Sequence, residues 1–135
     1  GVIGRIEGGH IGGRKGGWNS QFVVSVPKDT MNTKELISLP MTDKRAQQFY
    51  TDFISALNNH LKEKGWSDIY MQHIADEPTE FNYATYIEIA KFVKKLAPEF
   101  KFIEACHSHW ITQIGIMNST KHKPKPARKR GCTPA

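Results

Sequence analysis

Residues 71–78, "MQHIADEP", pass from a largely apolar run into two adjacent carboxylates and then a proline. The run at residues 69–75 is typical of a short buried strand. Two neighbouring negative charges repel each other, and burial would raise the cost of holding them together. Asp76 and Glu77 therefore either remain solvated in a loop or occupy a site that makes use of their repulsion.

Segments with helical periodicity flank this strand on both sides. Apolar residues recur at helical spacing over residues 46–61, with Thr42 expected as the N-cap and Gly65 just beyond the end. A second helix is predicted over residues 83–97, because the same spacing recurs there and Pro98 stops it.

Two further runs favour β-structure. Residues 21–26, "QFVVSV", stop at Pro27 and predict a short strand or hairpin arm, and residues 101–106, "KFIEAC", predict another strand. The order strand, helix, strand, helix, strand predicts an α/β fold with parallel βαβ units. Sites in such folds lie at the carboxyl ends of the strands, where Asp76 and Glu77 are expected.

The first twenty residues contain eight glycines around a short apolar start. So much glycine excludes a stable helix and predicts a short strand followed by a long loop. The glycines lack the Lys-Ser/Thr ending of a phosphate-binding P-loop, so this segment is not expected to cradle a nucleotide.

The chain of 135 residues is the size of one domain or of part of one. Six of its 19 basic residues fall within residues 119–135, which hold no acid, so the remaining 13 balance the 13 acidic residues. We therefore divide the chain into an α/β unit at residues 1–118 and a basic tail at 119–135. The composition of the tail predicts a solvated, disordered end, and a weak nucleic-acid arm is the alternative.

Other compositional features exclude some classes of protein. No run approaches the roughly 18 apolar residues of a membrane span, so no membrane partner is expected. Cys106 and Cys132 do not provide a disulfide framework. Neither localisation nor oligomeric state can be read from these features.

The close spacing of Asp76 and Glu77 limits the reactions that they can catalyse together. Consecutive α-carbons lie about 3.8 Å apart, so Asp76 and Glu77 cannot straddle a sugar ring as the separated pairs of most glycosidases do. They can instead enter one pocket, where the charge of Asp76 would favour a proton on Glu77, as a general acid needs.

Two alternatives for this pair remain open from the residues alone. The acids can be solvated charges near the N-terminus of the next helix, where the helix dipole favours them. They can also join His73, His107 and His109 as metal ligands, although no spacing here matches a standard metal motif. No metal site is therefore predicted.

Three motifs occur in order along the chain: "RIEGGHIGGRKGGW" at residues 5–18, "ALNNHLKEKGW" at 56–66 and "QHIADEP" at 72–78. Together they resemble the catalytic domain of glycoside hydrolase family 123, the β-N-acetylgalactosaminidase-like enzymes, over roughly residues 1–105. The resemblance implies part of a (β/α)8 TIM-type barrel and a carbohydrate substrate. It also implies retaining, substrate-assisted hydrolysis of a β-linked N-acetylhexosaminide, with N-acetylgalactosamine favoured.

The resemblance assigns roles to particular residues and implies no cofactor. Asp76 would orient the 2-acetamido group of the substrate, and Glu77 would protonate the leaving oxygen and then activate water. Sugar-binding residues would be Glu7, His10, Arg14, Trp18 and His73.

Each assignment has a plainer alternative. His10 and Arg14 can belong to an ordinary polar loop, Trp18 can pack, and a lone strand histidine such as His73 is often a hydrogen-bonded core residue. Beyond Ala105 the sequence departs from the family pattern. The alternative to an active glycosidase is thus a non-catalytic remnant or a carbohydrate-binding fragment.

Overall fold

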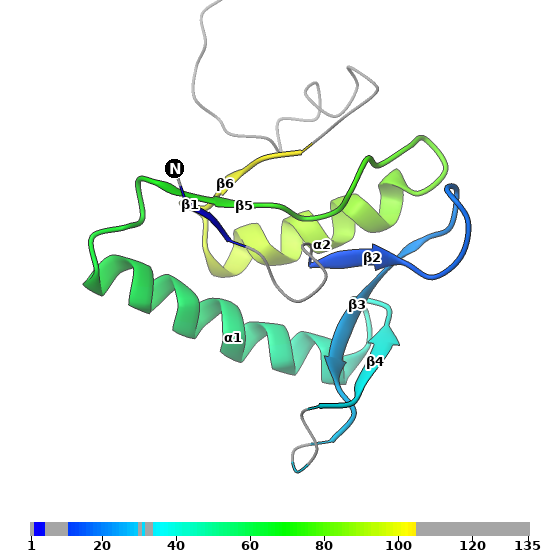
Figure 1. The fold of residues 1–135 in the computed structure, drawn as a ribbon, viewed down its shortest axis with the longest axis horizontal. Helices are drawn as coiled ribbons and strands as arrows, with labels where there is room; N and C mark the ends of the chain where they lie inside the picture. The colour runs from blue at the N-terminus through cyan, green and yellow to red at the C-terminus, as the bar shows by residue number, and fades with distance from the viewer. Residues whose placement is uncertain (1, 5–10, 30, 32–33, 105–135) are drawn as a thin grey trace, which may run out of the picture.

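A computed structural model describes residues 2–4, 11–29, 31 and 34–104 of the chain. Two helices and two small sheets fill this part of the molecule (Figure 1). The elements in chain order are β1 (Val2–Gly4), β2 (Gly12–Arg14), β3 (Phe22–Pro27), β4 (Leu36–Leu39), α1 (Lys44–Glu63), β5 (Tyr70–Gln72), α2 (Tyr83–Leu96) and β6 (Lys101–Phe102).

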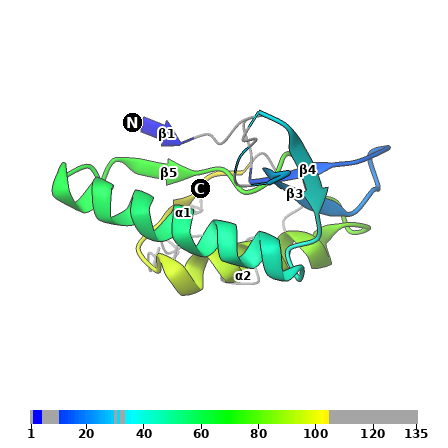
Figure 2. The same ribbon diagram turned by 90° about the horizontal axis from the view of Figure 1, so that it is seen from below.

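One sheet is parallel and has the strand order β1-β5-β6. Its register sets Val2 opposite Tyr70 and Gln72 opposite Phe102. Both helices lie on the same side of this sheet (Figures 1 and 2), and Tyr70, Gln72 and Phe102 are buried. The predicted α/β class with parallel strands and crossover helices is therefore confirmed.

The second sheet is antiparallel, with the order β2-β3-β4, and it corrects one expectation. Residues 21–26 do not supply the first parallel strand, because β1 pairs with β5 instead. Phe22, Val24 and Val26 are buried while the residues between them are half-buried, a pattern typical of a sheet with one covered face. The hairpin-arm alternative is confirmed, and β2 and β4 were not predicted.

The two sheets meet where β5 ends. The Gly12 amide donates to the carbonyl of Ile74 at 2.7 Å, and Gly12 forms a parallel bridge with Ala75. A Cβ on Gly12 would lie 2.9 Å from Cδ1 of Ile89, closer than packed side chains allow. A side chain at this junction would therefore require the buried end of Ile89 to shift.

The N-cap of helix α1 lies one residue later in the chain than expected. Asp43, and not Thr42, is the N-cap: its backbone is extended and its carboxylate accepts a 2.8 Å hydrogen bond from the Arg45 amide. After the helix, Gly65 adopts φ +68°, as predicted for a glycine just past a helix end. The Tyr50 hydroxyl donates to the Ser25 carbonyl at 2.8 Å and links α1 to β3.

Helix α2 confirms the second helical prediction, and its buried face is formed by Tyr86, Ile89, Ala90 and Val93. Strand β5 is shorter than the predicted residues 69–75, because regular pairing stops at Gln72. Neither helix is long and apolar enough to cross a membrane, as judged over the described residues. The predicted tail at 119–135 and the end of the strand predicted at 101–106 lie outside the described residues.

Candidate active site

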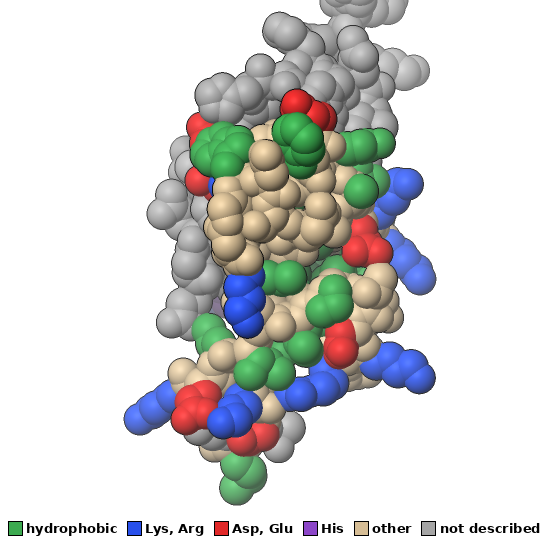
Figure 3. Space-filling model, turned by 90° about the vertical axis from the view of Figure 1, so that its right-hand side faces the viewer, with side chains coloured by type: hydrophobic (Ala, Val, Ile, Leu, Met, Phe, Trp, Pro, Cys, Tyr) green, Lys and Arg blue, Asp and Glu red, His purple; other side chains and the backbone are tan. Residues whose placement is uncertain are grey.

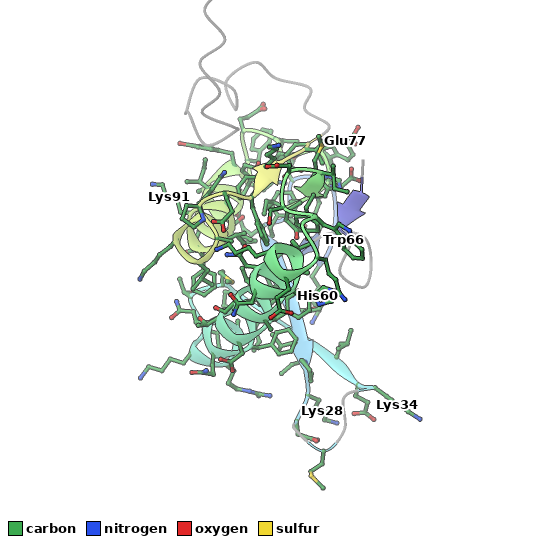
Figure 4. All side chains as sticks on the ribbon, turned by 90° about the vertical axis from the view of Figure 1, so that its left-hand side faces the viewer. Lys28, Lys34, His60, Trp66, Glu77 and Lys91 are labelled. Carbon is green, nitrogen blue, oxygen red and sulfur yellow. The ribbon has the colours of Figure 1, made fainter. Side chains whose placement is uncertain are left out.

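Asp76 and Glu77 lie in a loop that leaves the carboxyl end of β5. Asp76 is exposed and Glu77 is half-buried. Glu77 has φ +43°, the one positive φ of a non-glycine residue in the described part of the chain. Such a conformation is uncommon and costs free energy, so the surroundings must hold it in place. Figure 4 shows Glu77 at the opposite end of the molecule from Lys28 and Lys34.

Arg14, at the end of β2, holds the backbone of this loop. Its Nη2 donates to the carbonyl oxygens of both Asp76 and Glu77, the second at 2.6 Å. Charged donors make strong hydrogen bonds, and one guanidinium that bridges two successive carbonyls fixes their relative orientation. Arg14 thus acts on the carboxylate pair through the main chain.

The guanidinium group of Arg14 lies close to two aromatic rings. Its central carbon is 4.6 Å from the centroid of Trp18 and 5.2 Å from that of Phe22, both within cation–π range. Trp18 remains 49% exposed, whereas Phe22 is buried. This arrangement orients Arg14 towards the loop and leaves part of Trp18 in contact with solvent.

Glu104 approaches the same loop from the other side. Its carboxylate accepts hydrogen bonds from the Ile74 amide at 2.8 Å, the Ala75 amide at 3.5 Å and the Tyr86 hydroxyl at 3.3 Å. The side chain has no exposed surface. The loop is therefore tied to β6 and to α2 just before Asp76.

His73 and Asp76 shape the electrostatics around Glu104. His73 Nε2 lies 2.9 Å from Oε2 of Glu104. Burial raises the pKa of Glu104 to about 8, and the negative charge of Asp76 acts in the same direction. Near neutral pH this shift favours the neutral, protonated form of the Glu104 carboxyl group.

Exposed aromatic side chains flank the loop. Phe81 is 59% exposed and lies on the segment that leads into α2. The side chain of Asn82 donates to the carbonyls of Trp18 and Ser20 at 3.1 and 3.2 Å, which ties this segment to the β2–β3 turn. Figure 3 shows the face that lies on the right in Figure 1, and hydrophobic and acidic side chains lie next to each other at its upper end.

The structure thus brings four of the predicted site residues to one end of the molecule, namely Arg14, Trp18, Asp76 and Glu77. His73 is beside them but faces Glu104. Glu7 and His10 lie outside the described residues, as do His107 and His109. Among described residues no three His, Cys, Asp or Glu side chains gather as metal ligands.

Sequence reasoning missed Glu104. The available signal was its place in "KFIEAC", just after a strand predicted to run parallel to β5, since carboxyl ends of parallel strands share one edge of a sheet. A groove of about 450 Å³ lies elsewhere, between the end of β3 and the start of α1. It is lined by Val26, Pro27, Asp29, Arg45, Gln48, Phe49 and Asp52.

Comparison with known families shows the class to which the chain belongs. Residues 16–130 match the glycoside hydrolase 123 catalytic domain, which is most of the chain, and the protein belongs to this family. The match extends well beyond Ala105, where the resemblance was expected to fade, and it includes Asp76, Glu77 and Glu104. No curated protein matched the chain. The protein is therefore glycoside hydrolase-like.

Proposed function

We propose that this chain supplies the catalytic carboxylates of a retaining, substrate-assisted glycosidase. Its substrate is a β-linked N-acetylhexosaminide, with N-acetylgalactosamine favoured. The observation that carries the proposal is the position of Asp76 and Glu77 in the loop that follows the parallel strand β5 in a family 123 catalytic domain. We further propose that the β1-β5-β6 sheet is part of a (β/α)8 barrel, whose sites lie at this end of the strands.

The proposed reaction divides the work between two carboxylates and the substrate. The acetamido carbonyl oxygen attacks the anomeric carbon while Glu77 gives its proton to the leaving oxygen, so the glycosidic bond breaks and an oxazolinium intermediate forms. Asp76 orients the acetamido group and balances its positive charge. Glu77 then takes a proton from water, which attacks the anomeric carbon and restores the acetamido group.

Adjacent residues suit this division because the substrate brings its own nucleophile. A protein nucleophile and an acid would need about 5 Å between their carboxyl groups, on opposite sides of the bond. The left-handed backbone at Glu77 breaks the alternation of an extended chain, which allows both side chains to serve one face of the sugar.

The neighbouring residues supply further contacts in this proposal. Trp18 and Phe81 are exposed aromatic surfaces beside the loop, suited to the apolar face of a sugar ring. Glu7, His10 and His73 remain candidates for polar contacts to the carbohydrate. Arg14 contributes by holding the carbonyls of the carboxylate loop.

The test is release of the aryl group from an aryl N-acetyl-β-galactosaminide by the unchanged protein, Glu77→Gln and Asp76→Asn. Turnover is expected from the unchanged protein, with losses of about a hundredfold or more in both variants. Glu80→Gln, at an exposed carboxylate three residues further on, is the matched control and should keep full activity. Equal release by the protein and Glu77→Gln would refute the proposal.

A carbohydrate-binding fragment without turnover is the second candidate. The parallel sheet in the described residues has three strands of only two or three residues each, so a closed barrel is not seen there. Titration with N-acetylgalactosamine, followed by intrinsic tryptophan fluorescence to which Trp18 contributes, distinguishes the two. Saturable binding with no aryl release supports this candidate, and turnover excludes it.

A further inference from the structure

The carboxylate loop, residues 74–77, is held by two side chains: Arg14 is a hydrogen-bond donor and Glu104 is an acceptor. Arg14 binds the carbonyl groups of Asp76 and Glu77, and Glu104 binds the amide groups of Ile74 and Ala75. A donor thus holds one half of the loop and an acceptor holds the other. Four successive residues are fixed through their main chain.

Glu104 itself cannot reach a substrate. Its side chain has no exposed surface and is enclosed by the loop after β5 and by Tyr86 of α2. Any influence on a reaction must therefore pass through the groups that it binds.

The contacts of Glu104 use both carboxyl oxygens. Oε1 accepts from the Ile74 amide and the Tyr86 hydroxyl, while Oε2 lies near the Ala75 amide and 2.9 Å from Nε2 of His73. A buried carboxyl group is costly unless its oxygens are satisfied, and here they are satisfied from two separate segments. The residue therefore works as a rigid link between β6, α2 and the loop.

The link matters because reacting groups tolerate little displacement. A shift of about 1 Å from a distant change can lower a rate by about a hundredfold. Ala75 immediately precedes Asp76, so freeing its amide and that of Ile74 would let both carboxylates move. We propose that Glu104 is a positioning residue for Asp76 and Glu77, an inference that rests on the proposed hydrolase function.

The experiment compares Glu104→Ala and Glu104→Gln with Glu88→Gln, which removes an exposed carboxylate from α2. Two quantities are measured: amide hydrogen exchange by NMR at Ile74 and Ala75, and kcat and KM on the aryl N-acetyl-β-galactosaminide. In Glu104→Ala, exchange at both amides should rise about tenfold or more while α1 stays protected. The value of kcat should fall about tenfold to a hundredfold, with KM within about threefold.

Two conservative variants, Glu104→Gln and Tyr86→Phe, remove only part of the hydrogen bonding of Glu104. Glu104→Gln keeps one oxygen for the Ile74 amide, so its exchange and kcat should lie between those of the unchanged protein and Glu104→Ala. Tyr86→Phe removes one hydrogen bond to Oε1 without removing the carboxyl group, and a severalfold drop in kcat is expected. It serves as the probe if Glu104→Ala fails to fold, and Glu88→Gln should match the unchanged protein throughout.

The outcomes separate this inference from the function on which it rests. If the unchanged protein has no turnover, the hydrolase proposal fails for this chain, and the exchange rates decide alone whether Glu104 holds the loop. If the protein is active and Glu104→Ala matches it in exchange and kcat, Glu104 is not a positioning residue. Faster exchange with unchanged kcat also overturns the positioning role.

Discussion

Arg14 donates a 2.6 Å hydrogen bond to the backbone carbonyl of Glu77, the residue held at φ +43°. Lysine keeps the positive charge but lacks the planar group with several fixed donors that binds both carbonyls. Arg14→Lys should therefore lower turnover of the aryl glycoside by about tenfold or more, because charged hydrogen bonds contribute about 1.5–3 kcal/mol each. The neighbouring exposed Lys15, changed to Ala, is the control and should keep its activity.

Gly12 offers a test of the junction between the two sheets. A methyl group at Gly12 would meet Cδ1 of Ile89 at 2.9 Å, whereas a methyl group at Gly13 meets nothing within 4 Å. Gly12→Ala should lower the free energy of unfolding by about 1–3 kcal/mol through overpacking. Gly13→Ala should change it by about 0.5 kcal/mol or less. Urea unfolding measures both, and equal effects would contradict the close packing.

The buried Glu104 predicts how stability varies with pH. Burial raises its pKa from 4.5 to about 8, so between these values the folded state keeps a proton that the unfolded chain releases. This contribution to stability is fully present below pH 4.5 and is lost as the pH rises towards 8. The slope is at most about 1.4 kcal/mol per pH unit, moderated by the facing His73, Asp76 and Tyr86.

Glu104→Gln has no proton to release, so its free energy of unfolding should vary less over the same range. Urea unfolding at several pH values between about 5 and 8 compares the two proteins. Glu88→Gln, at an exposed position, should retain the pH dependence of the unchanged protein. Identical slopes for the unchanged protein and Glu104→Gln would show that Glu104 is not the titrating group.

The start of α1 provides a matched pair of neighbours. Asp43→Ala removes the carboxylate that accepts the Arg45 amide and should destabilise the protein by about 1 kcal/mol. Thr42→Ala changes the exposed residue before the cap and should have little effect. Thermal unfolding of the two variants checks the assignment, and the reverse order of effects would restore Thr42 as the cap.

Local patterns predicted both helices and part of the strands, but not β2 or β4. The spacing of apolar residues gave both helices, since each buries one face: Tyr50 and Ile54 in α1, Tyr86 and Val93 in α2. The partner of β5 was not predictable in this way. Phe22 to Val26 reads as a strand whether its neighbour is parallel or antiparallel, because strand propensity carries no information about pairing.

The same distinction between local patterns and distant contacts applies to the candidate site. Asp76 and Glu77 were identified from the sequence because a strand, two acids and a proline adjoin in it. The roles of Arg14 and Glu104 depend on contacts across 63 and 30 positions, which no local pattern encodes. Arg14 was expected to face a sugar, and the structure shows its hydrogen bonds directed to the main chain of the loop.

The separation of Arg14 and Glu104 along the chain also bears on the order of folding. Helices form within microseconds from local contacts, whereas closing long loops is slow because their entropy must be lost first. The carboxylate loop needs both distant side chains, so we expect it to acquire its final shape after the helices have formed. Truncated or partly folded forms should therefore retain their helical circular dichroism yet lack an ordered pair of acids.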